Sequence, residues 1–314
     1  MTTDAPIPAQ RVRIYEVAPR DGLQNEVVAI STADKVRLIE ALVGCGFTDI
    51  EVTSFVRPTW IPQLADAAEV VAALPRSEGV RYWGLVPNRQ GLERALGVGL
   101  HHVATVMSAS ETHNQKNLNR TRRESLAGLR EVIGEAVAND VAVRAYISTV
   151  FGCPYEGAVD VERTVELAGE LLAAGADEVA LGDTTGMANP TQVSHVIARM
   201  VAAGISVDRL ALHLHDTRGA ALANALSGWQ AGVRTFDGSV AGVGGCPYAP
   251  GAAGNAATED LVAMFEAMGV HTGVDLDATA DVGVFLAGVL GRELPGRYHR
   301  FHVGAAQRRS SRTA

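Results

Sequence analysis

The chain has 314 residues with a formal net charge of −8 at pH 7, and 47% of its residues are hydrophobic while 5% are aromatic. This apolar content is sufficient for a large core and excludes a disordered chain, and the negative charge gives no electrostatic support for nucleic-acid binding. No apolar run reaches the roughly 18 residues that a membrane span requires, so we expect no membrane-spanning segment.

Short apolar runs alternate with longer amphipathic segments along most of the chain. The predicted strands are residues 13–19, 48–54, 81–86, 102–107, 141–150, 178–182, 210–214 and 235–240. The predicted helices between them include residues 32–43, 123–138, 161–173, 190–203 and 220–231. Asp160 is in a position to cap the helix that follows it, and Gly175, Gly204 and Gly232 come just after helix ends, where left-handed residues are common.

Eight β/α units in roughly 250 residues predict an α/β fold of the (β/α)8 TIM-barrel type. An open doubly wound sheet is the alternative, and it is disfavoured because no Gly-x-Gly-x-x-Gly motif follows the first strand. We assign the catalytic barrel to residues 13–270, a short C-terminal helical extension to residues 271–306, and a disordered polar tail to residues 307–314.

Polar residues gather where several of the predicted strands end. The first strand runs into residues 19–26 (PRDGLQNE), and the second carries Glu51. The sixth strand ends in residues 182–186 (GDTTG), and the seventh continues into residues 213–217 (HLHDT). Because the active sites of TIM barrels lie at the carboxyl ends of the strands, these residues predict a site at that end.

His213 and His215 are two positions apart on a strand, so both imidazoles face the barrel mouth while Leu214 packs on the opposite side. Asp21 follows the first strand, which neighbours the eighth in a closed barrel, and is a candidate third ligand. A carboxylate, two imidazoles and an amide suit Mg²⁺ or Mn²⁺ better than a closed zinc site. A hydrogen-bonded core histidine and a capping role for Asp21 are the alternatives that stay open.

The three cysteines, Cys45, Cys153 and Cys246, do not suggest a disulfide framework and favour a reducing, cytoplasmic location. Cys246 lies in a glycine-rich segment, residues 244–255 (GGCPYAPGAAGN), which we interpret as a mobile lid rather than a phosphate-binding loop because the P-loop ending is missing. Cys45 fits a packed structural thiol. Cys153 is ambiguous because its surroundings, residues 152–157 (GCPYEG), echo those of Cys246.

These motifs resemble the 3-hydroxy-3-methylglutaryl-CoA lyase family, which belongs to a superfamily of metal-dependent lyases and synthases built on a TIM barrel. The resemblance extends over residues 13–276, and residues 54–58 (SFVRP) and 257–261 (ATEDL) also carry it. It implies that Asp21, His213, His215 and Asn255 bind Mg²⁺ or Mn²⁺. It also implies that the protein forms a homodimer or a larger homo-oligomer.

The resemblance further implies catalytic roles for five residues. Arg20 would meet the substrate carbonyl region, Glu51 and Asp183 would organise the site, and Cys246 would be the catalytic thiol, with Asp21 beside the metal. We assign substrate and coenzyme A binding to Arg20 and to three further polar residues, Gln24, Lys116 and Asn117.

The chain departs from the family pattern at four positions, and it has no counterpart of a Cys that some members carry near the C-terminus. Leu214 stands where the family often has Cys, and Arg218 stands where it often has Tyr. Val27 replaces a common basic residue, and Arg57 replaces a small Ser. The predicted metal and catalytic positions are intact, so the departures bear on the acyl group of the substrate rather than on the chemistry.

The predicted function is metal-assisted cleavage of 3-hydroxy-3-methylglutaryl-CoA to acetyl-CoA and acetoacetate. In this hypothesis Asp21, Glu51 or a metal-bound water takes the hydroxyl proton. Arg20 stabilises charge on the thioester oxygen, and Cys246 protonates the enolate. The alternatives are a lyase for a related 3-hydroxyacyl-CoA, such as a longer-branched 3-hydroxyglutaryl-CoA or citramalyl-CoA, and a Claisen-type synthase of the isopropylmalate or homocitrate kind. A non-catalytic relative is disfavoured because no predicted ligand is missing.

Overall fold

The computed structural model describes residues 10–245 and 254–313 of the chain. Its centre is a closed barrel of parallel strands in the order β1 to β8, with β1 paired to β8 through Arg13 and Thr235. The strands are Arg13–Glu16, Asp49–Ser54, Arg81–Leu85, His102–Ser108, Ala142–Ser148, Glu178–Asp183, Leu210–Leu214 and Thr235–Gly238. The predicted TIM barrel is therefore confirmed.

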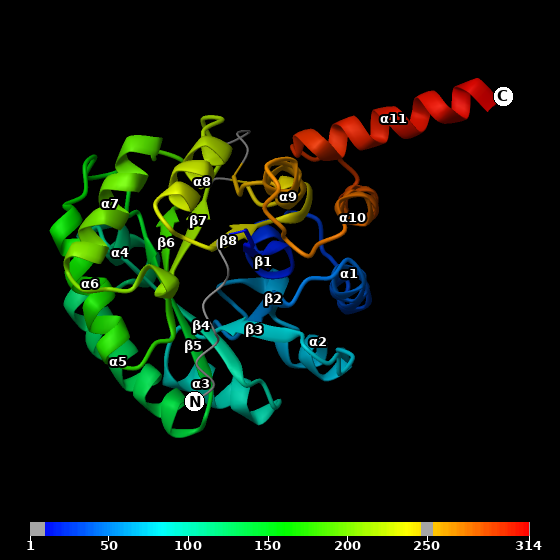
Figure 1. Cartoon of the computed structure of the whole chain (residues 1–314). Coiled ribbons are helices and arrows are strands. Elements are labelled where there is room, and N and C mark those ends of the chain that lie inside the picture. The colour runs from blue at the N-terminus through cyan, green and yellow to red at the C-terminus, as the bar shows by residue number, and fades with distance from the viewer. Residues whose placement is uncertain (1–9, 246–253, 314) are drawn as a thin grey trace.

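Helices surround the outside of the barrel, and the last of them, α11, extends away from it (Figure 1). They are α1 Thr32–Gly44, α2 Ala67–Ala73, α3 Arg89–Gly97, α4 Glu111–Leu118, α5 Arg122–Ala138, α6 Val161–Ala173, α7 Pro190–Ala202, α8 Ala221–Gln230, α9 Thr258–Ala267, α10 Leu276–Leu290 and α11 Arg297–Thr313. As predicted, the Asp160 side chain caps α6 by accepting the Glu162 N–H, and Gly175 follows the helix with φ +114°. Within the described residues no helix is both long and apolar enough to cross a membrane.

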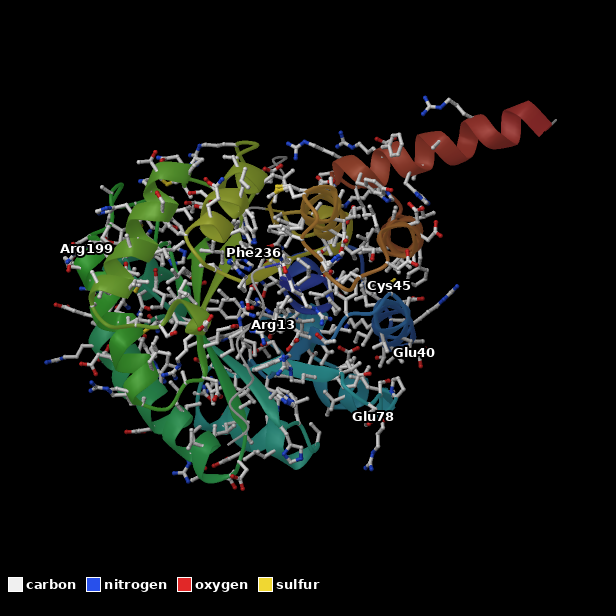
Figure 2. All side chains as sticks on the ribbon, viewed as in Figure 1. Arg13, Glu40, Cys45, Glu78, Arg199 and Phe236 are labelled. Atoms are coloured by element: carbon white, nitrogen blue, oxygen red, sulfur yellow. The ribbon has the colours of Figure 1, made fainter. Side chains whose placement is uncertain are left out.

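The core forms because the strands are buried on both faces. Every residue of β2, β6, β7 and β8 is buried, and the outward-facing apolar side chains pack against the helices in one large cluster. The interior of the barrel is partly polar, because Glu51, Arg144 and Asp237 are buried there. In the view of Figure 2 the label of Arg13 is near the centre, whereas Glu40 and Arg199 lie on the outer helices.

The first strand is shorter than the sequence pattern predicts. β1 ends at Glu16, and residues Ala18–Gly22 form a π-helical turn, η1, instead of continuing the strand to residue 19. Two local features explain the change: Pro19 sits at the start of the turn, and the Glu16 carboxylate accepts the Ala18 N–H at 2.8 Å. Single π-helical turns are rare and frequently occur at functional sites.

The predicted C-terminal extension is helical, and it is longer than expected. The last helix, α11, continues to Thr313 and projects away from the barrel (Figure 1), so residues 307–313 of the predicted polar tail are helical in the structure. After Gly304 this segment holds no further glycine and no proline to end the helix. The start of α11 is tied to α9, since the Asp260 carboxylate accepts the N–H groups of Arg297 and Tyr298 at 3.1 and 2.6 Å.

Candidate metal centre

Four side chains from distant parts of the sequence meet at the carboxyl end of the barrel. Asp21 comes from η1, His213 from β7, His215 from just after β7, and Asn255 from the segment before α9. Ligand atoms of Asp21, His213 and His215 all lie within 4.8 Å of one another. The two histidine Nε2 atoms are 3.2 Å apart, and Asn255 Nδ2 donates to Asp21 Oδ2 at 2.9 Å. The structure therefore brings together all four predicted metal ligands.

The residues of this cluster fit a divalent cation. Asn255 is 3% exposed and its Oδ1 has no hydrogen-bond partner within the described part of the chain, and the same holds for Nδ1 of His215, which is 5% exposed. Buried polar atoms are rarely left without a partner, and an unpaired amide oxygen beside a carboxylate and two imidazoles matches the mixed ligand set of Mg²⁺ or Mn²⁺. Leu214 packs in the outer apolar cluster, as expected for alternation along β7.

Burial and the surrounding charges favour the metal-binding protonation state of Asp21 and His215, whereas they act in the opposite direction on His213. Burial alone would raise the pKa of Asp21, but the nearby Arg20 and the two histidines outweigh it and lower the pKa to about 2. Burial, with the charge of His213, lowers the pKa of His215 to about 3, so this imidazole is neutral at physiological pH. Burial also acts to lower the pKa of His213, but the hydrogen bond to Asp237 and its charge outweigh burial and raise it.

Arg20 lies between two carboxylates next to the cluster. Its Nε donates to Glu51 Oε1, and its Nη1 donates to Asp21 Oδ1 at 2.5 Å. Glu51 is fully buried, and its other oxygen accepts hydrogen bonds from the hydroxyls of Tyr15 at 3.0 Å and Tyr146 at 2.9 Å. Both oxygens of Glu51 accept hydrogen bonds, so the Glu51 side chain is fixed and holds Arg20 in place.

Gln24 and Asp183 have local partners. Gln24 Nε2 donates to Asp21 Oδ1 at 2.9 Å, so it lies in the cluster rather than apart from it. Asp183 is in register with Leu214, and its Oδ1 accepts the N–H groups of Met187 at 2.8 Å and Ala188 at 3.1 Å. Burial raises the pKa of Asp183 to about 7. Its observed contacts organise the loop that follows β6.

Lys116 and Asn117 are exposed on α4, which follows β4 at the same end of the barrel. Lys116 Nζ lies 4.7 Å from the centre of the Tyr155 ring, a cation–π distance. No hydrogen bond among the described residues joins either side chain to the metal cluster. Their position suits the outer rim of the site.

Cys246 lies outside the described residues, but the two ends of its glycine-rich segment are described. The Asn255 N–H donates to Gly244 O at 3.3 Å, so the segment leaves and rejoins the fold at one place. A Cβ on Gly244 would lie 3.3 Å from Asp21 O. Cys45 and Cys153 are free and buried, and Cys153 Sγ contacts Ser110 Oγ at 3.0 Å.

The positions that depart from the family pattern, except Leu214, are exposed. Arg218 donates to the carbonyl oxygens of Thr185 at 3.1 Å and Gly186 at 2.6 Å, which ties the end of β7 to the loop after β6. Arg57 lies over the Trp60 ring at 5.8 Å, and Val27 is 99% exposed. None of these side chains displaces a member of the cluster.

The sequence interpretation missed four buried polar residues inside the barrel: Tyr15, Arg144, Tyr146 and Asp237. Tyr146 and Asp237 are bonded to each other at 3.0 Å although they are 91 positions apart. The available signal was alternation, because Arg144 and Tyr146 are two residues apart on β5 and therefore face the same side. Their partners on other strands could be identified only from the closed barrel.

Comparisons with known proteins agree with this geometry. The family model described as HMGL-like matches residues 11–285. A hydroxymethylglutaryl-CoA lyase of Bacillus subtilis is 49% identical over 288 residues, which cover 92% of this chain and 96% of the relative.

Two solved structures extend the comparison. The crystal structure of the Bacillus subtilis HMG-CoA lyase superposes with a TM-score of 0.91 at 48% identity, covering 95% of this chain and 99% of that one. An HMG-CoA lyase from Acinetobacter baumannii, solved in complex with coenzyme A and 3-methylmalate, has a TM-score of 0.89 at 40% identity, covering 94% and 96%. With a whole-barrel family match and relatives of this similarity, the chain belongs to the HMGL-like family, that of the hydroxymethylglutaryl-CoA lyases.

Proposed function

We propose that the chain is a carbon–carbon lyase that cleaves 3-hydroxy-3-methylglutaryl-CoA to acetyl-CoA and acetoacetate. The observation that carries the proposal is the convergence of Asp21, His213, His215 and Asn255 at the carboxyl end of the barrel. The match to the Bacillus subtilis lyase covers 96% of that relative, and the match to the solved Bacillus subtilis structure covers 99% of that chain. No feature of the described residues favours a synthase.

We propose Asp21, His213, His215 and Asn255 Oδ1 as the ligands of Mg²⁺ or Mn²⁺. When bound, such an ion supplies Lewis-acid stabilisation of negative charge on substrate oxygens. The chain contributes a site in which one carboxylate is ionised and one imidazole is neutral before binding, so the ion does not have to displace a proton from either group.

Arg20 is the proposed stabiliser of the thioester oxygen. Its planar guanidinium is held at Nε by Glu51 and at Nη1 by Asp21, which leaves the remaining N–H groups in a fixed orientation. A donor that is oriented before the reaction stabilises developing negative charge without reorganising. Tyr15 and Tyr146 support this arrangement through their hydrogen bonds to Glu51.

Cys246 is the proposed proton donor to the enolate. An ordinary thiol with a pKa of about 8.5 is largely protonated at neutral pH and can act as an acid. The place of Cys246 in the sequence supports this role, because it is two residues after Gly244, and the backbone of Gly244 packs against Asp21 and Gly22. The remaining proposed substrate contacts are Gln24 beside Asp21, and Lys116 and Asn117 at the rim.

An acyl-CoA thioester as substrate is supported by the coenzyme A complex of the Acinetobacter baumannii relative. Lys116 supplies positive charge at the rim, where the phosphates of coenzyme A would lie. Homo-oligomerisation and a cytoplasmic location stay predictions from the sequence. Size-exclusion chromatography with light scattering and cell fractionation test them.

A coupled assay for acetyl-CoA release tests the proposed function. Purified protein is incubated with 3-hydroxy-3-methylglutaryl-CoA, with EDTA, and with EDTA followed by excess Mn²⁺. We expect acetyl-CoA and acetoacetate in equal amounts, loss of activity with EDTA, and recovery with Mn²⁺. Citramalyl-CoA and a longer-branched 3-hydroxyglutaryl-CoA complete the panel, and faster turnover of either one would replace the proposed substrate.

A further inference from the structure

His213 has a carboxylate partner on the side of its ring that faces away from the cluster. Its Nδ1 lies 3.0 Å from Asp237 Oδ2, and β7 and β8 hold the two residues in direct register. Both side chains are buried, Asp237 at 2% exposure and His213 at 8%. A buried contact of this length between two adjacent strands fixes the ring plane of His213 as well as its position.

Asp237 is itself held from two further directions. Arg144, which is fully buried, donates from Nη2 to Asp237 Oδ1 and also pairs with Glu178, with Nη1 3.2 Å from Oε1. The Tyr146 hydroxyl lies 3.0 Å from Asp237 Oδ2. The carboxylate therefore has a cation on one oxygen and both its hydroxyl and imidazole partners on the other.

This arrangement determines which nitrogen of His213 carries the proton. An ionised carboxylate can only accept hydrogen bonds, so Nδ1 must bear the hydrogen in the neutral ring. The lone pair is then on Nε2, which lies 3.2 Å from Nε2 of His215 and 4.0 Å from Asp21 Oδ2. The ring presents its lone pair to the ligand cluster because of a contact made on its opposite side.

We propose that Asp237 is a positioning residue that sets the tautomer and ring orientation of His213 for metal binding. The inference rests on the proposed metal site and deepens it by adding a residue that does not itself touch the ion. Carboxylates placed behind metal-binding histidines orient the ring and raise its basicity, and their loss typically costs 10- to 100-fold in metal affinity.

Tyr146 provides the matched control. Its hydroxyl lies 2.9 Å from Glu51 Oε2 and 3.0 Å from Asp237 Oδ2, but its single hydrogen can be donated to one of them at a time. Glu51 keeps the Tyr15 and Arg20 hydrogen bonds without it, and Asp237 keeps Arg144 and His213. Removing this hydroxyl alters the surroundings of Asp237 but leaves the Nδ1–H acceptor in place.

The test compares wild type, Asp237→Asn and Tyr146→Phe as full-length proteins. Mn²⁺ affinity is measured by calorimetry after removal of metal, and the His213 tautomer is measured in the metal-free protein by ¹⁵N NMR of labelled histidine. We expect Asp237→Asn to weaken Mn²⁺ binding by about 10- to 100-fold and to lose the pure Nδ1–H tautomer. Tyr146→Phe should stay within about threefold of wild type in affinity and keep the tautomer.

Asp237→Asn leaves the buried Arg144 with one carboxylate fewer, so the variant could fail to fold. The double variant Arg144→Met with Asp237→Asn removes that excess charge, and the same two measurements on it should give the same losses. The proposal would be overturned if Asp237→Asn or the double variant kept both the wild-type Mn²⁺ affinity and the wild-type His213 tautomer. Since neither readout uses substrate, a wild-type protein that does not cleave 3-hydroxy-3-methylglutaryl-CoA would refute the proposed reaction separately.

Discussion

The two histidines of the cluster have different surroundings, although they are two residues apart. Nδ1 of His213 is bonded to Asp237, whereas Nδ1 of His215 has no hydrogen-bond partner within the described residues. His215 is therefore held by packing and by its neighbours in the cluster alone. Burial that lowers its pKa to about 3 keeps it neutral, which is the state that binds a metal.

Replacing His215 with Ala should reduce Mn²⁺ affinity on the order of 100-fold or more, because a direct ligand is lost and not merely its supporting contact. The measurement is a calorimetric titration of the metal-free protein. His271→Ala is the matched control, since this side chain is 75% exposed and pairs with Glu266 away from the cluster. Unaltered Mn²⁺ binding by His215→Ala would remove His215 from the ligand set.

Cys246 and Cys153 both occur in the local sequence Gly-Cys-Pro-Tyr. A comparison of variants at the two positions therefore tests whether the catalytic role belongs to Cys246 itself or to any cysteine in this motif. Cys246→Ser should lower turnover by about 100-fold or more while Mn²⁺ affinity is kept, because a hydroxyl is a far weaker acid than a thiol. Cys153→Ser should retain activity, since its Sγ contacts Ser110 in a buried position. Steady-state kinetics and Mn²⁺ titration of both variants check this, and equal turnover in Cys246→Ser and wild type rules out the acid role.

Single residues also show what a sequence can and cannot predict. Three of the proposed metal ligands could be predicted from the pattern, because His213 and His215 obey the two-residue period of a strand and because strand 1, which precedes Asp21, must close on strand 8 in a barrel; Asn255 came only from the family resemblance. Asp237 and Tyr146 could not, because each reads as one polar residue in an apolar strand until its partner is known. Their contact depends on the inward faces of two non-neighbouring strands, β5 and β8.

The elements were predicted to within a few residues wherever a hydrophobic period defined them. β7 and α6 match their predicted bounds, whereas β1 ends three residues early at Glu16. The pattern failed there because the π-helical turn η1 is set by Pro19 and by the Glu16 carboxylate, and neither has a periodic signature. The failure coincides with the segment that carries Arg20 and Asp21.

The described ends of the glycine-rich segment are shaped by close packing. Gly244 has φ +100°, and a Cβ there would lie 2.6 Å from Asn255 Nδ2 and 3.0 Å from Gly22 Cα. Gly245, the next residue, has nothing within 4 Å of the same position. The sequence suggested a lid, and at Gly244 the structure supplies another reason for glycine: the backbone must pass close to a proposed metal ligand.

Gly244→Ala should therefore displace Asn255, weaken Mn²⁺ binding by about 10-fold or more, and lower stability by about 1–3 kcal/mol through backbone strain. Gly245→Ala, with an open position for its methyl group, should change neither quantity appreciably. Calorimetric titration and chemical denaturation of both variants make the comparison. The packing argument fails if the two variants behave alike.

For the molecule as a whole, two buried acids make stability depend on pH. Burial raises the pKa of Glu16 to about 7 and that of Glu259 to about 8. Glu16 accepts hydrogen bonds from the Val240 N–H and the Thr258 hydroxyl, and Glu259 accepts the Ala241 N–H. These contacts join β1, the end of β8 and α9, so they lie where the barrel meets its C-terminal helices.

Because the folded-state pKa of each acid is raised, the folded protein binds more protons than the unfolded chain between about pH 4.5 and the folded-state value. The contribution of each protonated acid to the free energy of unfolding is complete below pH 4.5, and it is lost as pH rises through the folded-state pKa values of about 7 and 8. Glu259→Gln should reduce this loss by up to about 1.4 kcal/mol per pH unit. Urea denaturation from pH 5 to 8 measures the free energy of unfolding of each protein. Glu166→Gln, at an exposed position, is the control. The prediction is contradicted if this free energy changes with pH equally in Glu259→Gln and in wild type.

The pairing of β1 with β8 has a consequence for synthesis of the protein in the cell. Asp21 leaves the ribosome early, but the other proposed ligands, His213, His215 and Asn255, are made after roughly two thirds of the chain, and the strand that completes the sheet beside Asp21 begins at residue 235. A nascent chain can fold its early helices and strands, yet it cannot hold a metal ion in this way until Asn255 has emerged. At the proposed site, metal binding by all four ligands therefore has to wait for the synthesis of at least the first 255 residues.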